Sequence, residues 1–63
     1  MTLGEKIIAY RAMNDLSQTE FAKLCKLDRA YISDIENEKK VPGKIAKLKI
    51  EFVLDGEKIN KEV

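Results

Sequence analysis

Two neighbouring stretches decide the fold: Ser17-Gln18-Thr19-Glu20-Phe21-Ala22-Lys23-Leu24-Cys25 and Asp28-Arg29-Ala30-Tyr31-Ile32-Ser33-Asp34-Ile35-Glu36-Asn37. The first opens with a capping box. In such a box the Ser17 hydroxyl accepts from the Glu20 N–H, and the Glu20 carboxylate accepts from the Ser17 N–H. The spacing of the apolar residues that follow predicts a short helix with one apolar face, formed by Phe21, Ala22, Leu24 and Cys25, and an end near Lys26.

The second stretch predicts another helix, with Asp28 as its N-cap candidate. Ile32 and Ile35 share a narrow apolar face, whereas the opposite side is polar. Two short helices joined by a tight turn, the second polar on its outer side, form the unit that places a helix in the major groove of DNA. An ordinary surface helix has the same pattern, so this feature alone leaves both interpretations open.

The flanking segments complete a single domain, since 63 residues allow one at most. Upstream, apolar residues at helical spacing predict a first helix of about three turns that ends at Asn14-Asp15; they are Leu3, Ile7, Ile8, Tyr10 and Met13. Downstream, Pro42-Gly43 breaks the chain.

The C-terminal segment is open to two interpretations. Leu48-Lys49-Ile50-Glu51-Phe52 alternates strictly, and Asp55-Gly56 is typical of a hairpin turn. The favoured prediction is therefore a mainly α, small α+β fold, in which a three-helix core carries a C-terminal β-hairpin at 47–63. The alternative is an all-α fold with a fourth helix at about 44–54, ended by Gly56.

The quoted stretches resemble the Xre/Cro/C1 family of phage repressors, and the similarity extends upstream through Leu3-Gly4-Glu5-Lys6-Ile7 and Arg11. It covers about residues 3–42. The resemblance implies a lambda repressor-like core whose helix-turn-helix, at 17–37, binds double-stranded DNA. The chain departs from the family at Glu38, where glycine is usual. It departs again after Pro42, where 47–63 resembles the dimerisation hairpin of Cro repressors.

Four residues on the outer side of the second helix are candidates for reading bases: Arg29, Ala30, Ser33 and Asp34. The Arg29 guanidinium can donate two hydrogen bonds to guanine O6 and N7, and the Asp34 carboxylate can accept from the cytosine amine. The Ala30 methyl group can contact the thymine methyl, and the Ser33 hydroxyl can bind a base or a phosphate. The competing hypotheses are that Arg29 contacts only phosphate and that Asp34 forms only an ion pair with a neighbouring lysine.

Polar residues around that helix are candidates for phosphate contacts: Gln18, Lys26, Asn37, Lys39 and Lys40. Gln18 lies at a helix N-terminus, which favours an anion, and the resemblance implies that it touches the DNA backbone. A solvated glutamine is the alternative. The resemblance also implies a structural ion pair between Arg11 and Glu36. Tyr31 is expected to pack on the preceding helix, with a hydrogen bond to phosphate as the alternative, and Cys25 to lie in the core.

Composition excludes several function classes. One cysteine and no histidine leave no disulfide within the chain and too few ligands for a Cys/His zinc site. No nucleophile stands beside a base, and no glycine loop cradles phosphate, so we expect no enzyme, catalytic residue, metal or cofactor. The net charge is only +1, but residues 39–50 hold five lysines and no acid. This lysine-rich segment either binds phosphate or is an ordinary solvated surface.

The expected function is a sequence-specific regulator, most simply a repressor of phage or prophage type, that binds a pseudo-palindromic operator as a homodimer. We expect it in the cytoplasm of a bacterial or phage-infected cell, with no membrane or small-molecule partner. The hairpin's outer edge would form the dimer seam. The alternative is a protein-interaction module, an antitoxin or anti-repressor, which is favoured by four acids in and beside the second helix: Asp28, Asp34, Glu36 and Glu38.

Overall fold

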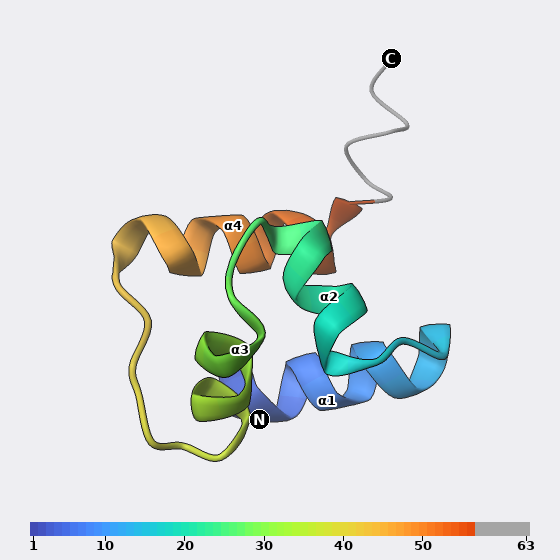
Figure 1. Ribbon diagram of the computed structural model, residues 1–63, viewed down its shortest axis with the longest axis horizontal. Helices are drawn as coiled ribbons and strands as arrows, with labels where there is room; N and C mark the ends of the chain where they lie inside the picture. Colours follow the sequence, from blue (N-terminus) through green and yellow to red (C-terminus); the bar gives the residue numbers. More distant parts are fainter. Residues whose placement is uncertain (57–63) are drawn as a thin grey trace.

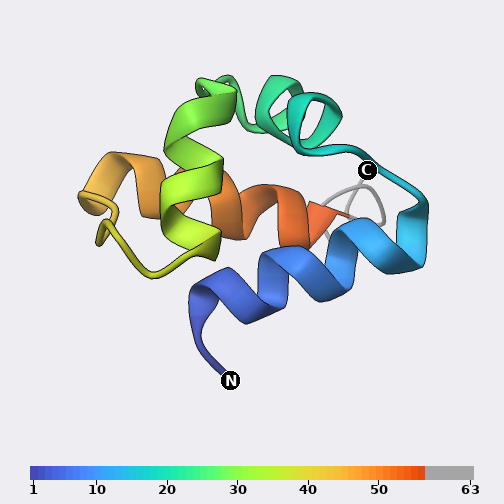
Figure 2. The ribbon, with the colours of Figure 1, turned by 60° about the horizontal axis from the view of Figure 1, so that its bottom comes forward.

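The computed structural model describes residues 1–56, which form four helices. They are α1 (Leu3–Asn14), α2 (Gln18–Cys25), α3 (Arg29–Glu36) and α4 (Lys44–Leu54). α2 runs between α1 and α4, and α3 packs against both α1 and α2 (Figure 1). In a second view α3 crosses over α4 and ends above α1 (Figure 2). Within residues 1–56 no helix has the length and apolarity needed to cross a membrane.

Local signals fix where the first helices begin. The Ser17–Glu20 capping box is confirmed, with the Glu20 N–H 3.0 Å from Ser17 Oγ and the Ser17 N–H 2.8 Å from the Glu20 carboxylate. A second box, between Thr2 and Glu5, starts α1 in the same way. The same Ser/Thr-x-x-Glu pattern in the sequence could have predicted it. Asp28 is the N-cap of α3, although its side chain makes no capping bond.

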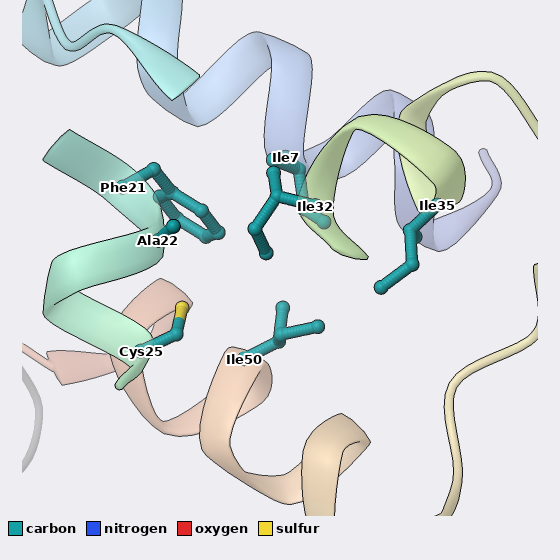
Figure 3. Packing of buried hydrophobic residues seen from close by; sticks show 7 residues of the cluster. All are labelled: Ile7, Phe21, Ala22, Cys25, Ile32, Ile35 and Ile50. Carbon is teal, nitrogen blue, oxygen red and sulfur yellow. The ribbon is translucent and has the colours of Figure 1, made fainter. Parts of the chain in front are cut away.

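The core lies where the four helices face one another (Figure 3). Its buried members come from every helix: Ile7, Phe21, Ala22, Cys25, Ile32, Ile35 and Ile50. The apolar face predicted for α3 is confirmed, since Ile32 is 0% and Ile35 3% exposed. Three other apolar residues are more exposed than their helical spacing suggested: Ile8, Met13 and Leu24.

The prediction of a hairpin strand from residue 47 is wrong, because α4 runs from Lys44 to Leu54. Alternation would place Leu48, Ile50 and Phe52 on one buried face of a strand. The structure instead buries Ile50 and exposes the other two, since a helix turns them to opposite sides. The fold of the described residues is thus the all-α alternative; the predicted partner strand lies outside them, beyond Gly56.

α1 and α3 cross at Gly4, where the backbones approach closely. A Cβ atom built on Gly4 would lie 2.5 Å from the Ile35 carbonyl oxygen and 3.1 Å from the Glu36 Cα atom. Both neighbours are backbone atoms, so they cannot move aside by a rotamer change. The absence of a side chain at this position therefore sets how closely α3 approaches α1.

We expect Gly4→Ala to destabilise the protein, although alanine is the better helix former by about 1 kcal/mol. Forcing the helices apart should outweigh that gain and lower the free energy of unfolding by about 1–3 kcal/mol. Urea denaturation followed by circular dichroism measures the change. Gly56→Ala is the matched control, because a Cβ atom there meets nothing within 4 Å. Equal unfolding free energies for the two variants would contradict the close crossing.

Candidate nucleic-acid interface

The Glu36 carboxylate, at the end of α3, joins three helices. Its Oε2 atom accepts from Arg11 Nε at 2.8 Å, and its Oε1 atom accepts from an Arg11 terminal nitrogen at 2.9 Å. The Glu36 side chain is 5% exposed and the Arg11 side chain 21%. This forked geometry is the strong form of an ion pair, because two parallel bonds fix both planes. The hydrogen bonding that Arg11 donates to Glu36 raises the pKa of Arg11 above its ordinary value, so the guanidinium stays charged.

Gln18 brings α2 into the same network. Its Nε2 atom donates to Glu36 Oε1 at 2.9 Å. Arg11 also donates to the Leu16 carbonyl oxygen at 3.1 Å, which ties the loop before α2 to α1. The sequence pattern assigned Gln18 to phosphate and gave no sign of this bond, since the partners are 18 residues apart. An amide nitrogen carries two protons, so one remains for another acceptor.

The four candidate base-reading residues lie away from the core on α3. Arg29 and Ala30 are exposed, and Ser33 and Asp34 are half-buried. Within residues 1–56 no hydrogen bond or ion pair engages the side chain of Arg29 or Asp34. The lysine partner considered for Asp34 is thus not found in this part of the chain. The outer side of α3 presents one cation, one anion, a hydroxyl and a methyl group.

The candidate phosphate contacts fall at the two ends of α3. Lys26 lies at the α2–α3 turn, beside the start of α3. At the other end, Gln18 is bonded to Glu36, and the Asn37 amide donates to the Ser33 carbonyl oxygen at 2.9 Å. Lys39 and Lys40 follow in the exposed segment after the helix. An eight-residue helix is about 12 Å long, so the two groups flank it at roughly that separation.

Tyr31 packs as expected and also orders the segment between α3 and α4. Its hydroxyl oxygen accepts from the Gly43 N–H at 3.2 Å, next to the start of α4. The Lys40 ammonium lies 5.0 Å from the centre of its ring, a cation–π distance. Half-buried Tyr31 therefore holds the middle and the end of this segment, at Lys40 and Gly43, near α3.

Glu38 adopts the left-handed conformation, with φ of 62°. Glycine reaches that region without steric penalty, which is a physical reason for glycine to be usual there in the resembling family. Here Glu38 has a contact of its own, because its carboxylate accepts from the Thr2 hydroxyl at 2.8 Å. The acid is therefore directed toward the start of α1.

Cys25 lies in the core at 2% exposure. Burial raises the pKa of its thiol to about 11, because an apolar site disfavours the thiolate. The side chain packs as a small apolar group beside Phe21 and Ala22.

By class, this arrangement of α2, a tight turn and α3 defines a helix-turn-helix protein. A helix-turn-helix family model matches residues 7–48, which is two thirds of the chain. The chain belongs to the Xre-type helix-turn-helix family, as the resemblance predicted. It is therefore a DNA-binding transcription regulator in kind, of a family that is generally non-enzymatic. No curated protein and no solved structure matched the chain.

We expect Glu36→Gln to lower the free energy of unfolding by about 1.5–3 kcal/mol, because Arg11 loses a charged acceptor where water reaches it poorly. Urea denaturation measures the loss. Glu20→Gln is the matched control, since glutamine also serves in a capping box, and its effect should stay within about 0.5 kcal/mol. If both variants lost the same small amount, the Glu36 network would not be what holds the three helices.

Proposed function

We propose that the chain is a sequence-specific repressor of Cro type, from a phage or prophage, which binds a pseudo-palindromic operator as a homodimer. The observation that carries the proposal is the outer side of α3. Its buried side is anchored by Ile32, Ile35 and Glu36, while Arg29 and Asp34 have no partner within residues 1–56. Base edges offer the donors and acceptors that such side chains lack.

The dimensions of α3 support entry into the major groove. The groove is about 12 Å wide, and the cations and amides at the two ends of α3 are separated by about the same distance. Lys26, at the start of α3, would contact the phosphates on one side of the groove. Gln18 and Asn37, at the end of α3, would contact those on the other side. The bond to Glu36 holds the Gln18 amide in place and leaves one of its protons for a phosphate. The Asn37 amide donates to both the carbonyl and the hydroxyl oxygen of Ser33, so a phosphate would take the place of the longer bond, which is 3.4 Å.

The position of the acids supports DNA over a protein partner. Four acids in and beside α3 favoured an interaction module in the sequence. Glu36 is bound by Arg11 and Gln18, and Glu38 by Thr2. Two of the four acids are therefore left: Asp34 on the outer side of α3, and the exposed N-cap Asp28, whose side chain makes no capping bond. Asp34 can face a cytosine amine, so the acids favour an acid-rich docking surface less than the sequence suggested.

A dimer fits the energetics of operator recognition. One module of this size buries only about 600–1,000 Å² of its surface on DNA, which gives too little discrimination against a genome of competing sites. Two copies related by a two-fold axis would bind half-sites about one helical turn apart. In this proposal the whole chain is one domain in the cytoplasm, needs no cofactor or small-molecule ligand, and represses by occupying its operator.

Selection of bound sequences from random DNA, repeated with Arg29→Ala, tests the proposal. We expect wild-type protein to select a two-fold symmetric site and to lose affinity steeply as salt rises. Arg29→Ala should relax the preference at one base pair per half-site, a loss of about 1–3 kcal/mol in discrimination.

Lys39→Ala is the matched control, because losing a phosphate contact should weaken all sequences equally and leave the selected site unchanged. Selection of an unchanged site by Arg29→Ala would remove that residue from base reading. Binding that neither discriminates among sequences nor depends on salt would favour the protein-interaction alternative.

A further inference from the structure

α4 carries an apolar stripe on the side opposite to its core contact. Ile45, Leu48 and Phe52 follow one another at helical spacing and are 65%, 55% and 59% exposed. Buried Ile50 lies on the other side of the same helix. Leu24, at the end of α2, is 52% exposed and lines a shallow apolar groove of about 350 Å³ with Leu48 and Phe52. We call Leu24, Ile45, Leu48 and Phe52 the α4 stripe.

Such a stripe is unusual on a domain of this size. A 63-residue chain buries only about 60% of its unfolded surface, so its folding free energy is small. Large apolar side chains that stay exposed add nothing to that free energy. Scattered apolar residues on a surface need no explanation, but a contiguous group marks an interaction site. None of the candidate base-reading residues belongs to the α4 stripe, so the surface is separate from the outer side of α3.

We propose that a second copy of this chain covers the α4 stripe, with the two α4 helices antiparallel. The charge order along the helix supports this partner and this direction. Lys44, Lys47 and Lys49 fall within the first six of the eleven residues of α4, whereas Glu51 follows them and Asp55 is the C-cap. Antiparallel pairing places each basic half against an acidic end, and parallel pairing would place lysine against lysine.

The spacing of the stripe also sets a register. When Ile45 faces Phe52 of the second copy, Leu48 lies close to the two-fold axis and meets its own counterpart. Lys44 and Glu51 are seven residues apart, so they lie along the same edge of the stripe. In this register, Lys44 of one copy comes next to Glu51 of the other. Lys49 borders the opposite edge, where its long stem lets the ammonium remain in water.

The inference rests on the dimer of the proposed function and gives it an interface. The dimer seam predicted from the sequence lay on the edge of a hairpin strand, which the helical structure of 44–54 removes. An interface between two α4 helices related by a two-fold axis is isologous, because each copy contributes the same surface. The assembly is therefore complete with two copies, and both stripes are covered. The state is therefore a dimer and not an open chain of subunits.

Disulfide trapping tests both the partner and the direction, in a Cys25→Ala background. Leu48→Cys should cross-link to itself under mild oxidation, because the two sulfur atoms meet near the axis. Ile45→Cys alone should not, since its two copies lie about 10 Å apart along the helix, beyond disulfide reach. An equal mixture of Ile45→Cys and Phe52→Cys chains should form the mixed dimer. Lys23→Cys, exposed on α2, reports random collision.

Sedimentation gives an independent readout. Phe52→Lys should keep the circular dichroism of the wild type, because the residue is exposed, and should weaken dimerisation at least about tenfold. Met13→Lys is its control off the stripe, because it places the same charge on an exposed apolar residue of α1.

Three outcomes would overturn the inference. Equal self-cross-linking by Ile45→Cys and Leu48→Cys would show parallel pairing. Cross-linking of Leu48→Cys no faster than Lys23→Cys would show that residues 57–63 or a different protein occupy the stripe. A dimer unaffected by Phe52→Lys would place the seam elsewhere. In each case salt-dependent DNA binding by the wild type would survive, so failure of this interface is distinguishable from failure of the proposed function.

Discussion

The carboxylate of Glu36 accepts hydrogen bonds from Arg11 on α1 and Gln18 on α2, so three helices meet at one nearly buried charge. Apolar packing is non-directional and tolerates small rotations of a helix. A forked guanidinium–carboxylate pair does not, because its hydrogen bonds need both distance and plane. Removing Arg11 or Glu36 leaves the other as a charge that water reaches poorly, so alternative orientations of α3 are penalised. The network thereby fixes which side of α3 faces outward.

The same network decides which charges the outer side of α3 presents. Glu36 lies on the helix that is proposed to enter DNA, and a free carboxylate there would repel phosphate. Its pairing with Arg11 neutralises it inside the protein, and its bond to Gln18 orients an amide at the helix N-terminus of α2. Gly4 acts from the other side, because its missing side chain lets α1 approach the end of α3. Stability and the proposed recognition of DNA therefore depend on the same few atoms.

Local signals in the sequence predicted the first three helices, whereas α4 depended on contacts that no local pattern records. The Ser17–Glu20 box is self-contained within four residues, so it could be recognised directly. In α4, the same residues fit both the alternation of a strand and the spacing of a helix. The structure has the helix, which packs on α2 and buries Ile50 in the core while Leu48 and Phe52 stay exposed. The Gln18–Glu36 hydrogen bond could not be predicted from the sequence for a related reason, since only the fold brings its partners together.

We propose that the outer side of α3, held in place by Glu36, is the surface that meets DNA. Backbone amide chemical shifts, followed by NMR while a short random-sequence duplex is added at low salt, map that surface residue by residue. We expect the shifted amides to cluster at Gln18, Lys26 and residues 29–40, with little change along α4. Shifts concentrated on α4 or on the exposed side of α1, with α3 unchanged, would contradict it.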